Sequence, residues 1–243
     1  MRSKQLKVAL IAHTPGAGEL AAVAARLCYS GSDIAQLQSL ATEREQSGFL
    51  RGVMSSGHLS VVEHASFTFA IEGVSRALLA QLTRHRIASF SVQSQRYVSF
   101  EQGFDYVTPP AIRALGQEAV DEYDAQMAQI HRWYQGWQNR LGRDENGNED
   151  ARFVLPKACE TRLILTMNTR ELLHFFSLRC CNRAQWEIRD VAEQMLWLVK
   201  KVAPHLFAKA GPACLYGPCP EGKMCCGHAD EVRTHYAEMS GEK

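Results

Sequence analysis

Several features common in other proteins are missing from this chain of 243 residues, and each absence narrows its possible functions. No apolar run reaches the roughly 18 residues of a membrane-spanning helix. Neither GxGxxG nor GxxxxGKS/T occurs, so we expect neither common phosphate loop and no Rossmann dinucleotide domain. The first residues lack the apolar segment of a signal peptide. We therefore expect a cytoplasmic protein with mostly reduced cysteines.

An excess of charge of one sign is also missing. The chain carries 27 basic and 26 acidic side chains, which leaves a net charge near +1. A protein that binds nucleic acid through its whole surface would carry a larger basic excess. We therefore expect any local basic cluster to bind a small anionic ligand, and we expect neither nucleic acid nor a membrane as a partner.

The segment from Arg84 to Tyr97 contains no carboxylate, although it holds three arginines, one histidine, three serines and two glutamines. A solvent-exposed helix face would usually mix charges of both signs. Guanidinium groups without a carboxylate in their own segment favour an anionic acceptor from outside it. Because arginine binds phosphate through two parallel hydrogen bonds and stacks on planar rings, the segment predicts a nucleotide site. A basic surface patch or a subunit contact is the alternative.

Hydrophobic periodicity predicts strands and helices without a regular β-α-β order, which favours the α+β class over a doubly wound parallel sheet. The expected strands lie at residues 6–12, 66–71 and 160–168. The expected helices lie at residues 19–28, 33–54, 75–83, 117–141, 170–180 and 184–205. Residues 143–150 are predicted to be a loop, and the polar end of the chain after Asp230 is expected to be mobile.

Polar side chains lie within or beside apolar elements in four places, at residues 58–64, 81–96, 152 and 168–179. Each place alone has an ordinary explanation, such as a surface arginine or a buried histidine with a satisfied hydrogen bond. Together they bring arginines and histidines beside many apolar elements, and this repetition indicates a binding site.

These places resemble, in the same order, segments of the flavin-dependent thymidylate synthase family. Residues 84–97 match the family signature RHRxxSxxxxSxRY at every fixed position. Other similar segments are Gly57-His58 with Glu63-His64, residues 151–156, residues 168–170, and residues 178–179 with 184–188. Because the resemblance covers residues 6–207, we expect a domain at residues 1–207 and a Cys/Pro-rich C-terminal extension at residues 208–243.

The resemblance implies an enzyme that methylates dUMP to dTMP. The one-carbon unit would come from methylenetetrahydrofolate, and the reducing equivalents from NADPH would pass through bound FAD. The implied fold is α+β, with a twisted, mostly antiparallel sheet surrounded by helices in a single domain. The implied assembly is a homotetramer whose active sites form between subunits.

The resemblance also assigns residues to ligands. Those expected to contact dUMP are Gln81, Arg84, Ser94, Gln95, Arg96, Arg152 and Arg179. Those expected to contact FAD are His58, Ser60, Arg84, His85, Arg86, Asn168, Arg170 and His174. Arg179 is the expected catalytic residue, since a fixed positive charge beside uracil would stabilise the anion formed by loss of the ring imide proton. Val92 stands where many relatives carry Glu or Gln, so no side-chain role is assigned to it.

The cysteines raise two alternatives. A cysteine nucleophile, as in the folate-only thymidylate synthases, would come from Cys28, Cys159, Cys180 or Cys181, although we favour a role as small buried hydrophobes. A structural zinc ion could be held by Cys214, Cys219, Cys226 and His228. The paired CxxC motifs of a convincing zinc site are missing, so no metal is expected.

A non-catalytic nucleotide- or RNA-binding module is the competing hypothesis for the whole chain. The aromatic residues Phe90, Tyr97 and Phe100 lie among or just after the basic ones and would suit base stacking. The near-zero net charge and the lack of an RNA-module signature count against it.

Overall fold

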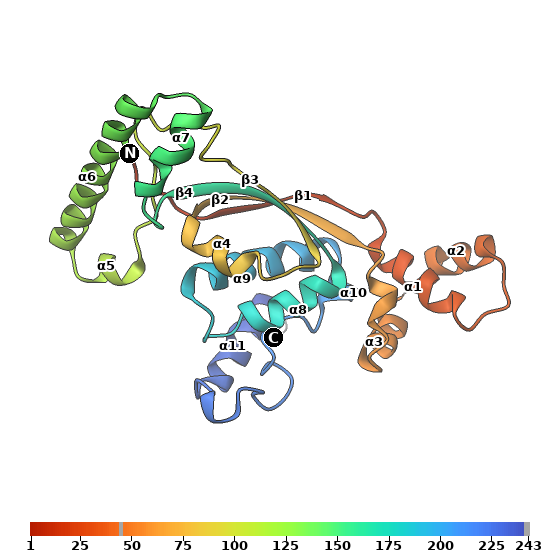
Figure 1. Cartoon of the computed structure of the whole chain (residues 1–243). Coiled ribbons are helices and arrows are strands. Elements are labelled where there is room, and N and C mark those ends of the chain that lie inside the picture. The colour runs from red at the N-terminus through yellow and green to blue at the C-terminus, as the bar shows by residue number, and fades with distance from the viewer. Residues whose placement is uncertain (44–45, 241–243) are drawn as a thin grey trace. The chain divides into compact units, whose positions relative to one another are not determined.

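The computed structural model describes residues 1–43 and 46–240 (Figure 1). In these residues, four strands form an antiparallel sheet in the order β1-β2-β4-β3. The strands are β1 (Lys7–His13), β2 (Ser66–Ser75), β3 (Ala88–Val92) and β4 (Glu160–Asn168). This confirms the predicted single α+β domain with an antiparallel sheet and its three expected strands.

Strand β3 lies inside the arginine-rich segment and was not predicted. Its half-buried residues Ala88, Phe90 and Val92 alternate with the exposed Ser89 and Ser91. This alternation is the sequence signal that could have identified the strand.

The chain divides into two compact units, and every strand passes from one unit into the other. The first unit comprises Met1–Lys7, Ala70–Arg84 and Phe90–Ile164. The second unit comprises Val8–Phe69, His85–Ser89 and Leu165–Lys243. The arginine-rich segment therefore contributes residues to both units.

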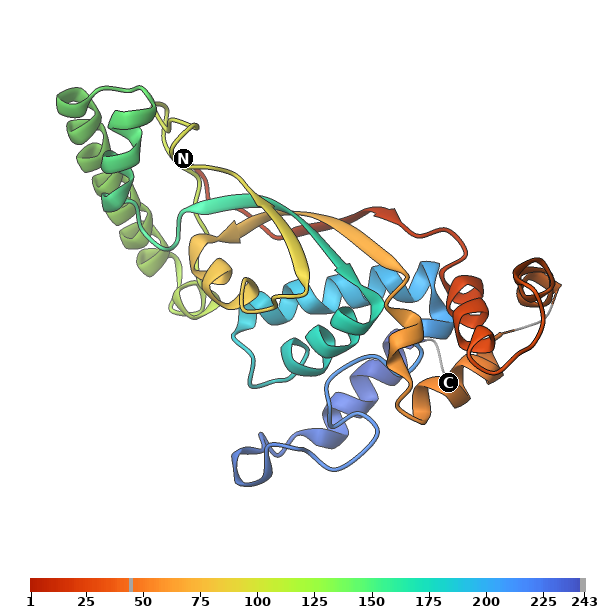
Figure 2. The same cartoon turned by 45° about the vertical axis from the view of Figure 1, so that its right-hand side comes forward.

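The first unit contains α4 (Arg76–Leu82), α5 (Pro110–Ala114), α6 (Gln117–Leu141), α7 (Glu145–Ala151) and the 3-10 helix η2 (Arg152–Val154). Helix α6 has the predicted bounds, whereas α7 stands where a loop was expected. The Asp144 carboxylate accepts a hydrogen bond from the Gly147 N–H at 2.9 Å and caps α7. The Gln138 side chain donates to Asn148 Oδ1 at 2.7 Å, which holds α7 beside α6 (Figure 2).

The N-terminal part of the second unit contains α1 (Ala17–Leu27), α2 (Ile34–Glu43), α3 (Ser47–Ser55) and the 3-10 helix η1 (Leu59–Val62). Helix α1 packs against both α2 and α3 (Figure 1). The single helix predicted for residues 33–54 is wrong, because two helices, α2 and α3, stand there; the part of that prediction at residues 44 and 45 lies outside the described residues.

Further along the chain, the second unit contains α8 (Thr169–Arg179), α9 (Trp186–Val202) and α10 (Pro204–Phe207), and α8 and α9 lie side by side (Figure 1). Three fully buried rings form part of its core: Phe67 of β2 and Phe176 of α8 both contact Phe207 of α10, at centroid distances of 5.3 and 6.0 Å. Burial of large aromatic rings dominates core energetics, so this contact fixes α8 against β2.

The C-terminal end of the second unit contains η3 (Gly222–Met224) and α11 (Ala229–Ser240). The expectation of a mobile tail is wrong for residues 231–240, because Val232 and Tyr236 are buried and the Tyr236 hydroxyl donates to Glu193 of α9 at 3.3 Å. Residues 241–243 lie outside the described residues.

All eight cysteines are free thiols. Across the described ranges, no group of three or more His, Cys, Asp or Glu side chains is placed to hold a metal ion. Among the helices of these ranges, none combines the length and apolar character needed to cross a membrane.

Candidate functional site

Helix α4 and the turn that follows it carry the first of the residues expected to contact dUMP. The Ser75 hydroxyl accepts a hydrogen bond from the Leu78 N–H at 3.3 Å and caps the helix. At its other end the Arg84 N–H donates to the Gln81 carbonyl at 3.3 Å. This tight turn places the half-buried Gln81 and the exposed Arg84 within one turn of each other.

A second turn, after β3, carries the next expected residues, also in the first unit. The Ser94 hydroxyl oxygen accepts hydrogen bonds from the N–H groups of Arg96 at 3.1 Å and Tyr97 at 3.4 Å. The Ser94 hydroxyl hydrogen therefore remains available to a ligand acceptor. The Gln95 side chain is buried and donates to Cys159 Sγ at 3.4 Å, so it points to the interior of the unit.

Helix α7 holds both arginines that are expected to bind phosphate. Arg96 forms ion pairs with Glu145 at 2.7 Å and with Glu149 at 2.5 Å. Arg152 Nε donates to the Glu149 backbone carbonyl at 3.0 Å. The terminal nitrogens of Arg152 have no partner within the described part of the chain. Glu149 thus positions both guanidinium groups.

Arg76 is a further cation of this cluster that the sequence prediction missed. Its Nη1 donates to the Gln93 carbonyl at 3.2 Å, next to the Ser94 turn. Burial lowers the pKa of Arg76, and the positive charge of Arg152 lowers this pKa as well. A cation in the first turn of a helix opposes the helix dipole, and this unfavourable placement was the available signal. An anion bound here would relieve the repulsion between the two arginines.

In the second unit, His85 joins Glu171 and Arg179 in a hydrogen-bonded chain. Arg179 Nε donates to His85 Nε2 at 3.1 Å, and His85 Nδ1 lies 3.0 Å from Glu171 Oε1. Because an arginine N–H can only donate, Nε2 is the acceptor and Nδ1 carries the hydrogen that goes to Glu171. Asn168 Oδ1 accepts from the Glu171 N–H at 2.9 Å and caps α8, which fixes Glu171 in turn.

The surroundings of His85 keep this imidazole neutral. Its ring is buried, with the Phe175 ring at a centroid distance of 4.9 Å and the His174 ring at 5.9 Å. Burial lowers the pKa of His85, and the charge of Arg179 acts in the same direction, against the opposing effect of Glu171. Burial also lowers the pKa of Arg179, so its charge acts in a partly desolvated environment.

The hydrogen-bonded chain predicts a pH-dependent stability. Since the pKa of His85 is lower in the folded than in the unfolded protein, the unfolded state binds more protons as the pH falls through and below the ordinary histidine range. The free energy of unfolding should therefore decrease from about pH 7 to about pH 5. Thermal unfolding of His85→Gln should show a smaller decrease in Tm over this range. The exposed control His64→Gln should keep the wild-type slope, and equal slopes in all three proteins would contradict the assignment.

The residues expected to contact FAD in the second unit fall into two groups. Asn168, Arg170 and His174 line one cavity of about 680 Å³, in which Arg170 Nη1 pairs with Glu63 Oε1 at 2.5 Å. His58 and Ser60 line another cavity, of about 470 Å³. The first cavity offers a guanidinium, an imidazole and an amide beside the carboxylates of Glu63 and Glu171, a mixed set of donors and acceptors that can hydrogen-bond a planar ring system.

The other expected FAD residues are not among the lining residues of these two cavities. His85 is buried with its ring against the His174 ring, and Arg86 is exposed. Arg84 belongs to the first unit, in which its side chain is exposed.

Comparison with known proteins gives a consistent result. Residues 9–205 match the family model described as "Thymidylate synthase complementing protein". A flavin-dependent thymidylate synthase from Geobacter sulfurreducens is 52% identical over 236 residues, which cover 97% of this chain and 100% of the relative. One from Clostridium tetani is 47% identical over 249 residues, with the same coverage of 97% and 100%. A crystal structure of a UMP/dUMP methylase from Streptomyces cacaoi, bound with 5-Br dUMP, is similar with a TM-score of 0.71, 26% identity, and coverage of 85% of this chain and 95% of that one.

Proposed function

This chain belongs to the flavin-dependent thymidylate synthase family, and from that membership we propose that it converts dUMP to dTMP. Methylenetetrahydrofolate is the one-carbon donor, and NADPH is the reductant through bound FAD. The observation that carries the proposal is the arrangement of the carboxylate-free segment from Arg84 to Tyr97. It supplies both Arg96, linked through Glu149 to Arg152, and His85, linked directly to Arg179.

The dUMP phosphate binds to the cationic cluster of the first unit. Arg96 and Arg152 supply charged donors, and the Ser94 hydroxyl and the Gln81 amide supply neutral ones. Hydrogen bonds between ionised partners are the strongest available for this purpose. Arg84 and Gln95 are assigned to dUMP by resemblance, and the Gln95 side chain points into the interior of the unit.

Arg179 acts on the uracil ring. Its positive charge stabilises the anion that remains when the ring imide proton passes to solvent, and the more electron-rich ring becomes a better nucleophile. Arginine suits this role because it stays protonated and cannot take the proton itself. His85 Nε2 accepts the Arg179 Nε–H and orients the guanidinium, so His85 is a positioning residue in this step.

Candidate FAD contacts come from Asn168, Arg170 and His174 in the cavity of about 680 Å³. His58, Ser60, Arg84, His85 and Arg86 are assigned to FAD by resemblance. When bound, FAD supplies the hydride chemistry that carries reducing equivalents from NADPH to the one-carbon unit. The ion pair with Glu63 holds Arg170 at the cavity wall. The homotetramer, with active sites formed between subunits, is likewise proposed by resemblance.

The buried cysteines take no part in this chemistry. Burial raises the pKa of both Cys159 and Cys180 to about 12, so at neutral pH each is a thiol and not the nucleophilic thiolate. We expect a protein with Cys28, Cys159, Cys180 and Cys181 all replaced by Ala to form dTMP with a kcat within about tenfold of wild type, since cavities from such small deletions cost stability more than catalysis. Chromatography of the product checks this. Loss of all activity in a folded, flavin-loaded variant would instead support a cysteine nucleophile.

The proposed reaction is tested by an omission series with purified protein. The complete mixture contains dUMP, methylenetetrahydrofolate, NADPH and FAD, and dTMP is measured by chromatography. With protein freed of flavin beforehand, we expect dTMP only when all four are present, and little product from deoxyuridine, which lacks the phosphate. Binding of dUMP without any dTMP in the complete mixture would favour the non-catalytic nucleotide-binding module.

A further inference from the structure

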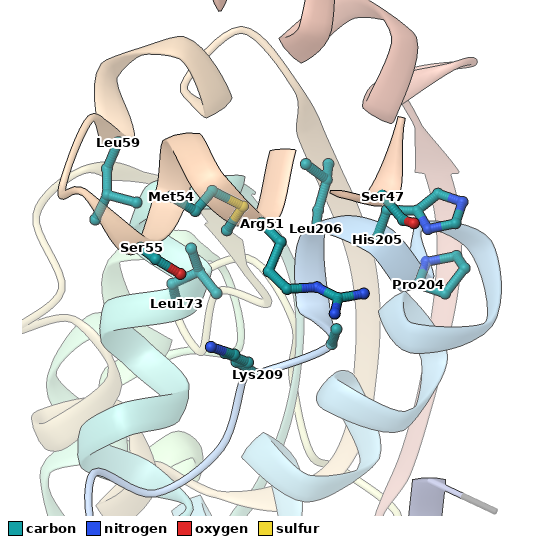
Figure 3. A pocket seen from close by; sticks show the side chains of 11 residues that line it. Ser47, Arg51, Met54, Ser55, Leu59, Leu173, Pro204, His205, Leu206 and Lys209 are labelled. Carbon is teal, nitrogen blue, oxygen red and sulfur yellow. The ribbon is translucent and has the colours of Figure 1, made fainter. Parts of the chain in front are cut away.

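A cavity of about 450 Å³ in the second unit has no role in the proposed function (Figure 3). Residues of α3, α8 and α10 and of the chain just after α10 line it. Leu59 and Leu173 line both this cavity and the candidate FAD cavity, so the two spaces share a wall.

Two cations reach into this cavity. Figure 3 shows the side chains of Arg51, from α3, and Lys209, from the segment after α10, extending into the space. No carboxylate stands among its described lining residues. Neither cation has a hydrogen bond or ion pair elsewhere in the residues that the structure describes. The cavity therefore presents two positive charges whose counter-ions must come from outside the unit.

The remaining wall is largely apolar. Met54 and Leu206 face the space together with the shared Leu59 and Leu173 (Figure 3). Apolar walls with a few convergent polar groups are typical of small-molecule sites. The lining thus fits a ligand that has an apolar body and two separate negative charges.

We propose that this cavity binds the benzoylglutamate end of the folate co-substrate. The two glutamate carboxylates pair with Arg51 and Lys209, and the benzoyl ring packs against Met54 and Leu206. This inference rests on the proposed function. It requires the other end of the same folate molecule, the pterin, to pass Leu59 and Leu173 and enter the neighbouring FAD cavity.

The 2′-phosphate of NADPH is also an anion and could pair with the same two cations. The placement of the cations favours the glutamate of folate over this phosphate. Figure 3 shows the charged ends of Arg51 and Lys209 at separate places in the cavity, which suits two carboxylates several bonds apart. A phosphate concentrates its charge at one centre and is best served by a planar fork of adjacent donors.

Direct binding to the flavin-loaded protein tests the proposal. Titration calorimetry would compare tetrahydrofolate with tetrahydropteroate, which lacks the glutamate, in the presence of dUMP. The wild-type protein should bind tetrahydrofolate more tightly than tetrahydropteroate. In the double variant Arg51→Gln/Lys209→Gln we expect tetrahydrofolate to bind about tenfold to hundredfold more weakly, as expected for lost hydrogen bonds between charged groups, and tetrahydropteroate to bind unchanged.

A matched control removes the same charge elsewhere. Arg132→Gln/Lys223→Gln changes two exposed cations outside the cavity and should keep the wild-type ratio of the two affinities. If Arg51→Gln/Lys209→Gln kept the wild-type ratio of the affinities for tetrahydrofolate and tetrahydropteroate, and the wild-type protein formed dTMP, the proposal would be overturned and the proposed function would stand.

Loss of the preference for NADPH over NADH in Arg51→Gln/Lys209→Gln, with the ratio of the two folate affinities kept, would assign the cavity to the 2′-phosphate instead. Failure of wild type to bind tetrahydrofolate at all and to form dTMP would overturn the proposed function as well.

Discussion

Replacement of Arg179 by Gln should leave FAD bound and lower kcat for dTMP formation by about a hundredfold to a thousandfold, the usual effect of removing one preorganised transition-state donor. The glutamine cannot stabilise the uracil anion with a positive charge. The loss should appear in kcat at saturating dUMP, because the interaction forms as the charge develops. Product formation at saturating dUMP, with flavin absorbance as the measure of cofactor content, provides the test.

Two further variants make this result specific. Arg179→Lys keeps a positive charge but lacks the Nε–H that donates to His85, so it should fall between wild type and Arg179→Gln. Arg189→Gln removes a cation from α9, outside the proposed site, and should keep the wild-type kcat. A flavin-loaded Arg179→Gln protein with a normal kcat would refute the assigned role.

Removal of either phosphate-binding arginine should weaken dUMP binding strongly. We expect Arg96→Ala and Arg152→Ala each to cost about 1.5–3 kcal/mol of dUMP binding free energy, the scale of a hydrogen bond to a charged group. Because Glu149 contacts both arginines, their effects should be coupled. The loss of dUMP binding free energy in Arg96→Ala/Arg152→Ala should therefore differ from the sum of the two single losses. Equilibrium binding of dUMP measures these losses.

The phosphate itself supplies the control ligand. Deoxyuridine should bind all of these proteins with the same affinity, since it offers no phosphate to lose. The control Arg143→Ala removes an exposed arginine of the same unit that pairs with Glu101, and it should bind dUMP as wild type does. Unchanged dUMP affinity in Arg152→Ala would place the phosphate elsewhere.

Local patterns in the sequence were enough to predict the elements that bury a regular face. Strand β2 was identified from alternation that puts Phe67 and Phe69 inside. Helix α6 was bounded correctly because its apolar residues recur at periods of three and four, and glycines with φ near +100° stand at both ends, Gly116 and Gly142.

Helices α7 and α11 could not be found in the same way. Helix α7 has Ala151 as its one apolar side chain and is held by the hydrogen bond from Gln138 to Asn148, a tertiary contact that periodicity does not reveal. Within the part of α11 whose burial is described, Val232 and Tyr236 are the buried residues, and their spacing of four residues was a signal that polar composition obscured.

In the candidate site, too, the sequence predicted what depends on local patterns and missed what depends on tertiary contacts. The family-like motif identified Arg96 and His85, but it said nothing of the carboxylates that position them. Glu149 lies in the unpredicted α7, and Glu171 is 86 positions from His85 along the chain. Pairings between segments so far apart depend on the tertiary fold, so they emerge only from the structure.

The most direct test of the proposed reaction is an anaerobic single turnover. The flavin-loaded protein would be reduced with NADPH, excess NADPH removed, and dUMP then added with methylenetetrahydrofolate while flavin absorbance and dTMP are followed. We expect the flavin to reoxidise with formation of an equal amount of dTMP. Reoxidation without dTMP, or a purified protein that binds no flavin, would contradict the proposed function.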